Sequence, residues 1–464
     1  MESARPDVLC AAQPFPERRV SPLPSRAPLL IRGAQLVTMN AGREILRGDL
    51  LVEEGRIARI SARPLRVPRG VAVLEARDSA LLPGLIQSHV HLCQVLFRNQ
   101  ADGMELLDWL QERIWPFEAA HDARSLAHSA RSGVAELLLG GTTAILDMGT
   151  VRHTEQLFRA AQESGIRYAG GKCLMDTGYA GLREETRAAL AEAVALGDRW
   201  HATDSGRISY ALCPRFVLSC TEQLWLAVRD LSRERGWLVH THASENRAEV
   251  RAVKQAVGED NVAWFHRIGL GSPRLVLAHC VHLTAQEGKL MARSGSSAVH
   301  CPGANLKLAS GIAPIPRMLA QGINVAIGAD GAPCNNTLDV FHELRLAATL
   351  HLPRFGPRSM PASEVLAMAT INGARALGQE RELGSLEVGK KADLTLVGLA
   401  APHLAPPGPD LHATLVYGAR ASDVTDVIVD GRHLVRNRKL LSLDAAALAR
   451  RAPAELARLK RRLR

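Results

Sequence analysis

Histidines and acidic residues recur in this sequence at spacings that can bring them around a single metal ion. His89 and His91 lie two residues apart after a short apolar run. Residues i and i+2 of an extended segment point to the same side, so both imidazoles can reach one ion. His242 and Asp330 stand at the ends of two later apolar runs. Three imidazoles and one carboxylate suit a divalent ion, most often zinc, and the same ligands also accept iron. Such an ion would lower the pKa of a bound water molecule toward neutrality and so supply hydroxide.

Two further side chains would complete a hydrolytic site. Glu245 follows His242 by three residues, off the ion but close to it. A proton shuttle belongs at such a position, where it takes a proton from water and returns it to a leaving amine. His279, within the segment LAHCVHL, could orient the hydroxide or polarise the substrate. The sequence therefore predicts metal-assisted hydrolysis.

The elements that must position these residues alternate between short apolar runs and amphipathic stretches. Eight βα units predict a (β/α)8 barrel more often than an open sheet, and such barrels carry their chemistry at the carboxyl ends of the strands. We predict that this barrel spans residues 84–383. The candidate strands are 81–87, 143–148, 167–175, 208–213, 237–243, 274–280, 297–301 and 324–329.

Both flanks of this region are rich in strand-like segments. Residues 29–60 alternate between apolar and polar positions, with Glu54-Gly55 at a hairpin turn. Similar segments return near the other end of the chain. We therefore predict one small β-sandwich built from 29–83 and 384–436. Its late candidate strands are 392–399, 414–419 and 426–435.

The two ends of the chain differ from the rest in composition. Residues 1–28 contain prolines, acids and arginines but no apolar stretch of a secretory signal, and we predict a disordered N-terminal extension. Of the net charge of +10, most lies from Arg436 onward, where ten basic residues face two acidic ones. We interpret 437–464 as a solvated basic helical tail interrupted by Pro453, and an acidic partner for it remains the alternative.

Composition also limits the partners and the location of the protein. Aromatic residues make up only 4% of the chain, whereas nucleic-acid-binding domains usually spread basic residues over a face with aromatics between them, so we expect no nucleic acid partner. No apolar run approaches the roughly 18–20 residues that a membrane-spanning helix needs, so we expect no membrane association. Eight cysteines without a CxxC pair favour a reducing cytoplasm.

Several motifs resemble the amidohydrolase superfamily, in particular its branch of metal-dependent heterocycle deaminases and s-triazine hydrolases. They are PGLIQSHVHL, VHTHASE, LAHCVHL, HCPGANLKLASGI, GADGAPCNN and GSLEVGKKADLTLV, and the resemblance covers about residues 29–436. It implies that Asp330 also accepts a proton from the metal-bound water and that Glu245 is the proton shuttle. The run ISYALCP offers no lysine for the bridging group of binuclear members, so one divalent ion per subunit is expected. The implied metal ligands are His89, His91, His242 and Asp330, and His279 is implied to face hydroxide and substrate.

Two signals for the substrate point in different directions. Trp109 and Glu118 are candidate substrate-binding residues. In relatives that act on adenosine-type nucleosides, a glutamate at the position of Glu118 holds the ribose hydroxyls, and a carboxylate that accepts two hydroxyl hydrogen bonds is a sensible ribose clamp. A helix-surface or capping charge is the alternative role for Glu118. Arg215 and Phe216 instead resemble guanine deaminases, where arginine and phenylalanine meet the base, although GADGAPCNN is unlike those enzymes. We rank adenosine-type nucleosides first.

The expected function is a metal-dependent hydrolytic deaminase. It would convert the exocyclic amine of a purine nucleoside, of the 5′-deoxyadenosine, methylthioadenosine or adenosine type, to a carbonyl with release of ammonia. A guanine or pterin deaminase and an s-triazine hydrolase remain alternative enzymes, and a binding protein that keeps the barrel as a scaffold remains the non-enzyme alternative. The resemblance also suggests a homo-oligomer.

Overall fold

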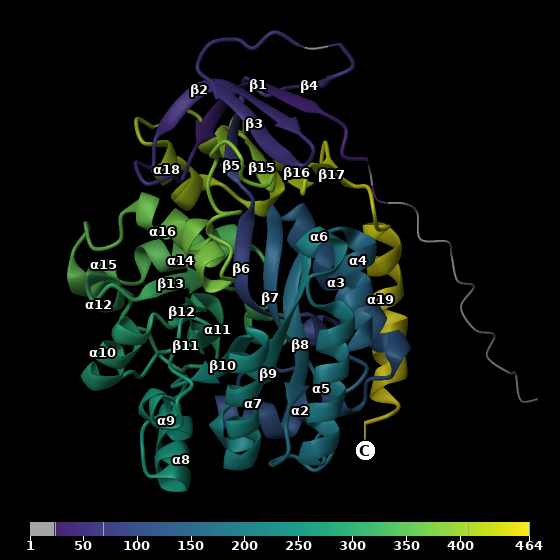
Figure 1. Ribbon diagram of the computed structural model, residues 1–464, viewed down its shortest axis with the longest axis vertical. Helices are drawn as coiled ribbons and strands as arrows, with labels where there is room; N and C mark the ends of the chain where they lie inside the picture. The colour runs from purple at the N-terminus through teal and green to yellow at the C-terminus, as the bar shows by residue number, and fades with distance from the viewer. Residues whose placement is uncertain (1–22, 24, 68, 407, 464) are drawn as a thin grey trace, which may run out of the picture.

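A parallel sheet that closes on itself forms the centre of the computed structural model, which describes residues 23, 25–67, 69–406 and 408–463 (Figure 1). Every neighbouring pair in this sheet runs parallel. Within the described residues its strands are β6 (Leu85–His91), β7 (Thr142–Thr150), β8 (Arg167–Leu174), β9 (Ile208–Pro214), β10 (Leu238–Ala243), β11 (Leu275–His279), β12 (Ser297–His300), β13 (Asn324–Ile327) and β14 (Asp330–Gly331).

The last two strands are one interrupted strand that closes the barrel. β13 pairs with β12, and β14, which starts three residues after the end of β13, pairs with β6. Gly328, between β13 and β14, lets this part of the chain lie close to β6, because a Cβ at that position would be 2.5 Å from the carbonyl oxygen of His89. The predicted barrel of eight parallel strands is confirmed. Its first strand begins later than predicted, at Leu85, because residues 79–83 belong to a strand of the other sheet.

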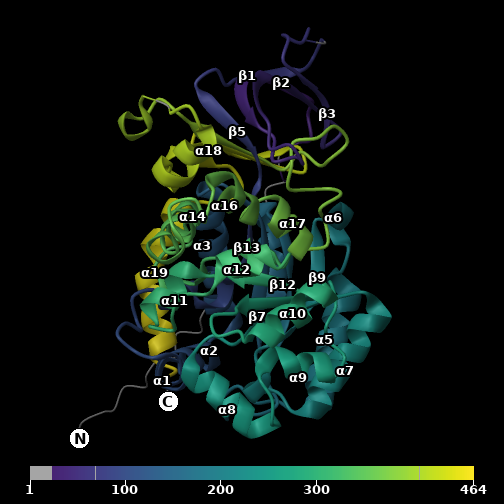
Figure 2. The same ribbon diagram turned by 90° about the vertical axis from the view of Figure 1, so that its left-hand side faces the viewer.

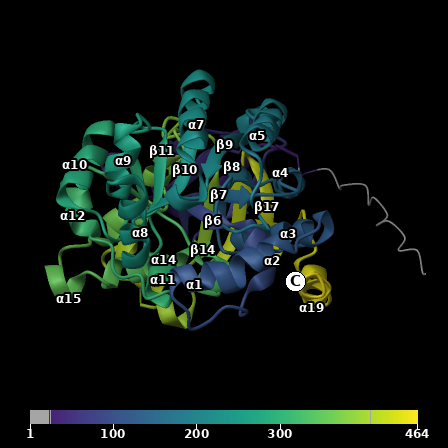
Figure 3. The same cartoon turned by 90° about the horizontal axis from the view of Figure 1, so that it is seen from below.

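Helices surround the barrel on its outer side, as Figures 1 and 3 show. Thr221 caps the helix that follows β9 by accepting a hydrogen bond from the Leu224 amide, and Gly236 ends it at φ +70°. Apolar side chains of strands and helices share one buried cluster. The main outer helices are α3 (Ala123–Leu139), α4 (Glu155–Ser164), α5 (Thr186–Trp200), α7 (Glu222–Arg235), α8 (Arg247–Val257), α9 (Asn261–Arg267), α10 (Ala285–Ser294), α12 (Ile315–Ala320), α14 (Val340–Thr349), α16 (Ala362–Met368) and α17 (Ile371–Ala376).

A second sheet from both ends of the chain covers the amino end of the barrel strands (Figure 2). β5 leads through Gly84 directly into β6, and β5 also pairs antiparallel with β15, so early and late segments join in one sheet. Side chains on one face of this sheet, among them Leu36, Leu50 and Leu394, form one buried apolar cluster. The sheet is therefore curved around these side chains. Its strands are β1 (Leu29–Val37), β2 (Ile45–Glu53), β3 (Arg56–Ser61), β4 (Ala72–Glu75), β5 (Ser79–Pro83), β15 (Leu394–Gly398), β16 (Val424–Val429), β17 (Arg432–Arg436) and β18 (Lys439–Leu440).

One predicted strand is wrong. Residues 414–419 do not join the sheet, because Thr414–Gly418 form a π-helix that follows α18 (Leu411–Ala413). Leu415 and Val416 are buried and belong to the apolar cluster of the barrel helices. A short apolar run has the same sequence pattern in a buried strand and in a buried helical turn, and only the surface against which it packs distinguishes the two.

A buried ion pair joins the barrel to the second sheet. Arg167 of β8 donates from Nε to Asp393 Oδ2 at 2.7 Å and from Nη2 to Asp393 Oδ1 at 2.9 Å. Asp393 Oδ1 also accepts the Asp430 amide at 2.8 Å. The charge of Asp393 raises the pKa of Arg167 against the opposing effect of burial. This pair is one of the contacts that connect the barrel to the second sheet.

The C-terminal helix α19 (Ala445–Lys460) packs along α3 (Figure 3). The expectation that Pro453 interrupts a solvated helix is wrong, because the helix continues through Pro453 and Leu459 is fully buried. Leu459 packs with Phe97 and Phe117, and Arg462 beyond the helix donates to the Ala120 carbonyl at 2.7 Å. Packing of the apolar face therefore outweighs the lost backbone hydrogen bond of a helix proline.

The N-terminal extension predicted for residues 1–28 lies mostly outside the described residues. Within the described part of the chain, no helix combines the length and the apolar character that crossing a membrane needs.

Leu459 provides a test of this docking. We expect Leu459→Ala to lower the free energy of unfolding by about 2–5 kcal/mol, because a fully buried leucine is truncated and leaves a cavity. Urea denaturation measures the change. Arg461→Ala, at an exposed position of the same segment, serves as control and should stay within about 0.5 kcal/mol of the wild type. Equal stability of the two variants would show that α19 is not packed as described.

Candidate functional site

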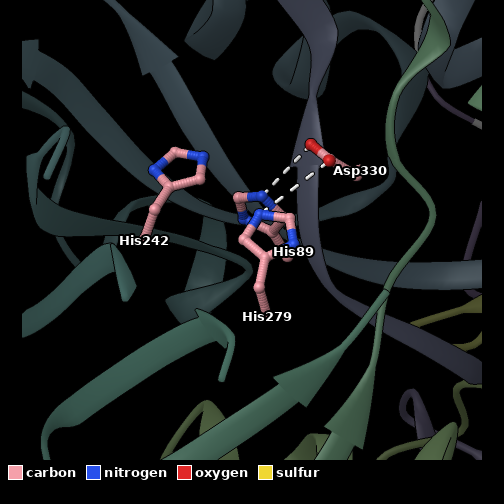
Figure 4. Close-up of side chains that lie close together, drawn as sticks. All are labelled: His89, His242, His279 and Asp330. Atoms are coloured by element: carbon pink, nitrogen blue, oxygen red, sulfur yellow. Dashed lines mark ion pairs between the residues drawn. The ribbon is translucent and has the colours of Figure 1, made fainter. Parts of the chain in front are cut away.

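The carboxyl ends of four barrel strands bring together His89, His91, His242, His279 and Asp330. Figure 4 shows four of them, His89, His242, His279 and Asp330. In the pairing of β14 with β6, Asp330 lies opposite Val90. Its Oδ1 is accordingly 3.2 Å from Nε2 of both flanking histidines, His89 and His91. The register of barrel closure thus sets the geometry of this cluster.

The other two histidines approach the same centre from β10 and β11. His242 Nε2 lies 3.2 Å from His91 Nε2, and His279 Nε2 lies 3.9 Å from Asp330 Oδ2. The potential ligand atoms of His89, His242, His279 and Asp330 all lie within 4.8 Å of one another. The structure therefore gathers the four residues predicted as metal ligands, and His279 joins them as a fifth.

The backbone around these residues leaves the strands in an uncommon conformation. Ser244, His279 and Asp330 have φ angles of +51°, +72° and +62°. Residues other than glycine rarely occupy this left-handed region, and such strain collects at functional sites where the surrounding structure enforces it. Here the packed strand ends enforce it, and they aim the side chains at the centre of the barrel mouth.

Outer hydrogen bonds fix the orientation of the imidazoles. His242 Nδ1 donates to the Arg215 carbonyl at 2.7 Å, and His279 Nδ1 donates to Asn305 Oδ1 at 2.9 Å. His240 Nδ1 donates to the Val276 carbonyl at 3.2 Å, so its Nε2 accepts from His89 Nδ1 at 2.8 Å. His240 and Asn305 were not predicted as site residues, although they stand within the quoted motifs VHTHASE and HCPGANLKLASGI.

These bonds leave the inner nitrogens as lone-pair donors. Nε2 of His89 and Nε2 of His279 are buried and have no hydrogen-bond partner. Burial lowers the pKa of His89 to about 4, so at neutral pH its lone pair faces the Asp330 carboxylate across 3.2 Å. A lone pair and a carboxylate that face each other at this distance favour a cation between them. The donor set, imidazole nitrogen with one carboxylate, fits a divalent metal ion.

Two acidic residues lie beside the cluster. Burial raises the pKa of Glu245 to about 7, and its Oε2 is 3.4 Å from His279 Nε2. Glu249, one helical turn later in α8, accepts the Glu245 amide at 3.1 Å, and burial raises its pKa to about 8. Glu245 can therefore both hold and release a proton near neutral pH, as a proton shuttle must. Glu249 was missed by the sequence analysis.

A pocket opens over the cluster. Its apolar wall includes Trp109 and Phe216, which the sequence analysis proposed as substrate-binding residues, together with Leu106 and Leu110. Trp109 ends α1 (Leu106–Trp109) and runs straight into a π-helix, Leu110–Ile114. π-helical turns are rare and frequently mark functional sites. A flat heterocycle could bind against this wall.

Glu118 does not line the pocket. It is in α2 (Trp115–Ala119) and is 5% exposed. Arg215, which does line it, donates from Nη1 to Glu118 Oε2 at 2.6 Å and from Nη2 to Oε1 at 3.2 Å. Burial alone would raise the pKa of Glu118, but the charge of Arg215 holds it below its usual range. The two residues taken as rival substrate signals form one ion pair.

Glu343 ties together the two loops that follow β12 and β14. It accepts the Gly303 amide at 3.0 Å and Asn335 Nδ2 at 2.9 Å. Gly303 lies in α11 (Pro302–Lys307), which also carries Asn305, the partner of His279. Glu343 is fully buried, and burial raises its pKa to about 7. The sequence analysis missed it, because it lies inside a helix pattern of α14.

Comparisons with known proteins agree with this geometry. Residues 80–434 match the amidohydrolase family. The 5-methylthioadenosine/S-adenosylhomocysteine deaminase of Moorella thermoacetica is 38% identical over 421 residues, which cover 90% of this chain and 96% of that protein. The 5′-deoxyadenosine deaminase of Methanosarcina mazei is 35% identical over 421 residues, which cover 90% and 95% of the two chains.

A solved structure shows the same architecture. An adenosine deaminase from Xanthomonas campestris with bound zinc superposes with a TM-score of 0.87 at 33% identity, covering 93% of this chain and 98% of that one. The similarity extends over both the barrel and the second sheet, since it covers nearly the whole chain.

The buried carboxyl of Glu343 predicts a pH dependence of stability. Its pKa is about 7 in the folded protein and about 4.3 in an unfolded chain, so the folded state retains a proton that the unfolded state loses. This contribution is fully present below pH 4.5 and is lost as the pH rises through 7. In Glu343→Gln we expect the decrease in unfolding free energy from pH 5 to pH 8 to shrink by up to about 3 kcal/mol.

Urea denaturation at both pH values measures this difference, with Glu234→Gln at an exposed position as control. If Glu343→Gln shows the same decrease as the wild type and the control, Glu343 is ionised in the folded protein at neutral pH and the assignment is wrong.

Proposed function

The chain belongs to the amidohydrolase family and is a hydrolase that acts on carbon–nitrogen bonds, and on that premise we propose that it deaminates a purine nucleoside. The resemblance predicted from the sequence motifs is confirmed by the family match. The observation that carries the proposal is the position of Glu245. It lies beside the histidine and aspartate cluster with a pKa of about 7, under a pocket with an apolar wall.

His89, His91, His242 and Asp330 are the residues that we propose to hold the divalent ion. The lone pairs of their inner nitrogens and the Asp330 carboxylate converge, and Asp330 Oδ1 is equidistant from His89 and His91. Zinc is the first choice, because the similar adenosine deaminase structure contains it, and iron suits the same ligands. When bound, the ion supplies an activated water molecule for attack on a ring carbon.

Proton transfers fall to side chains of the chain itself. Glu245 takes one proton from the attacking water and delivers it to a ring nitrogen. Asp330 accepts the second proton of the water, and this proton passes by way of Glu245 to the amine, which departs as ammonia. His279, with Nδ1 fixed by Asn305, keeps Nε2 directed at Glu245 and Asp330, where it orients the attacking oxygen. Water and the amine are consumed, and the carbonyl and ammonia are formed.

The nucleoside assignment is supported by the relatives. The proteins named above act, by their names, on 5-methylthioadenosine, S-adenosylhomocysteine and 5′-deoxyadenosine. In this chain the purine would lie against Trp109 and Phe216 with its amine toward the metal cluster. A cytoplasmic location is proposed as well, since the seven described cysteines are buried and unpaired. Assembly as a homo-oligomer stays a prediction.

A panel of amines assayed for ammonia release tests the substrate class. It contains 5′-deoxyadenosine, 5′-methylthioadenosine, S-adenosylhomocysteine, adenosine, guanine, a pterin and cytosine. We expect nucleosides with a small 5′ group to have the highest kcat/KM, because among the described residues that line the pocket Arg215 is the one permanent cation, and Glu118 already pairs with it. The carboxylate of S-adenosylhomocysteine therefore lacks a partner. Guanine as the best substrate, or chloride or alkylamine released from s-triazines, would replace the nucleoside assignment.

Glu245→Gln tests the mechanism. The amide keeps the shape but cannot transfer the proton, so we expect kcat to fall by about 10²–10⁴-fold while the metal content stays equal to that of the wild type. Elemental analysis and ammonia assays measure the two quantities. His242→Ala is the matched variant that should lose metal as well as activity. A Glu245→Gln enzyme with near-normal kcat would exclude the proton-shuttle role.

A further inference from the structure

The peptide bond that joins Ser244 to Glu245 is held on both of its sides. Its carbonyl, on Ser244, accepts the His282 amide at 2.9 Å, and its N–H, on Glu245, donates to Glu249 Oε2 at 3.1 Å. Glu245 itself lies between the end of β10 and the start of α8, in neither a strand nor a helix. These two hydrogen bonds therefore fix the backbone from which the Glu245 side chain leaves.

The turn at this point depends on such anchoring. Ser244 has φ +51°, a conformation that a residue with a side chain keeps only where the surrounding structure enforces it. Glu245 Oε2 lies 3.4 Å from His279 Nε2, and a displacement of about 1 Å near the reacting atoms can lower a rate about 100-fold. The placement of the proposed shuttle carboxylate therefore depends on the partner that holds its backbone.

Glu249 differs from an ordinary helix-capping residue. It is the third residue of α8, a position where glutamate often accepts backbone amides that precede a helix. Glu287 does the same in α10, where it accepts the Thr284 amide at 2.9 Å. The start of α8, however, already has a side-chain cap, since Asn246 Oδ1 accepts the Ala248 amide at 2.8 Å. Glu249 also lines the pocket over the metal cluster, which Glu287 does not.

Glu249 can hold this amide without adding a second negative charge beside the shuttle. It is 2% exposed, and burial together with the charge of Glu245 raises its pKa to about 8. Its carboxyl is therefore mostly protonated at neutral pH, and a neutral acid keeps an oxygen that accepts an amide hydrogen bond. Glutamine offers an acceptor of the same kind and reach, whereas aspartate is one methylene shorter.

We propose that Glu249 is a positioning residue for the deamination, which acts through Glu245. By holding the Glu245 amide, it aims the shuttle carboxylate at the ring nitrogen and the leaving amine, and it contacts neither the substrate nor the metal ion. The inference rests on the proposed function, since it takes Glu245 to be the proton shuttle.

Three variants of Glu249 separate its geometry from its charge. Glu249→Gln, the conservative replacement, keeps the acceptor and should retain kcat within about three-fold of the wild type. Glu249→Leu removes the acceptor and Glu249→Asp no longer reaches the amide, so each should lower kcat about 10–100-fold with KM within about three-fold. Ammonia release from the best nucleoside of the panel gives these constants, and elemental analysis should find the metal content of the wild type in all three variants.

A double variant tests whether the effect passes through the shuttle. Glu245→Gln already lacks proton transfer, and residues that act as a unit are not additive. Adding Glu249→Leu to it should therefore lower the residual kcat by less than about three-fold. Glu287→Leu is the matched control, because Glu287 is a buried glutamate at the same helix position that does not line the pocket. It should lower the midpoint of thermal unfolding without changing kcat.

The outcomes separate the inference from the proposed function. A wild-type enzyme that releases ammonia from no nucleoside refutes the proposed function. If nucleosides are deaminated, the inference alone is overturned by a wild-type kcat in Glu249→Asp, by an equal loss in Glu249→Gln and Glu249→Leu, or by an equally large effect of Glu249→Leu in the Glu245→Gln background. A raised KM at unchanged kcat also overturns it, because Glu249 then contacts the substrate. If Glu249→Leu does not fold, Glu249→Asp takes its place in each comparison.

Discussion

The pairing of β14 with β6 is the constraint on which the remainder of the site depends. It closes the barrel, and the same register places Asp330 opposite Val90, between two histidines that an extended strand points the same way. The carboxylate then lies 3.2 Å from both imidazoles. A barrel that closed one residue out of register would turn Asp330 to the other face of the strand, and the cluster would lose its only carboxylate at this distance among the described residues.

Burial gives the site its chemical character. His89, Glu245 and Glu249 lie where water is largely excluded, so the neutral forms of these three side chains are favoured. Neutral imidazoles are the form that binds metal, and a carboxyl with a pKa of about 7 is the form that exchanges protons. Desolvation therefore favours both metal binding by the imidazoles and proton exchange by Glu245.

Support for the pocket wall reaches the far end of the chain. α19 contributes Leu459 to a small cluster with Phe97 and Phe117. Phe117 is next to Glu118 in α2, and Phe97 ends the short 3₁₀ helix Leu92–Phe97 that carries Gln94. The C-terminal helix therefore packs against the two elements that carry Glu118, the partner of Arg215, and Gln94, which donates to Glu118.

The sequence by itself determined the barrel and the inner cluster. Strand ends are marked locally by apolar runs that stop at His91, His242, His279 and Asp330, and parallel strands collect those ends at one mouth whatever their order in the chain. The partners of these residues were decided only by tertiary structure. Glu118 and Arg215 are 97 positions apart. Considered alone, Glu118 suggests a nucleoside substrate, whereas Arg215 suggests guanine. Leu415 and Val416 read equally well as strand or helix until the surface that covers them is known. Local periodicity specifies which face of an element is apolar. The identity of a buried side chain's partner depends on how the elements pack against one another, and no single segment determines that packing.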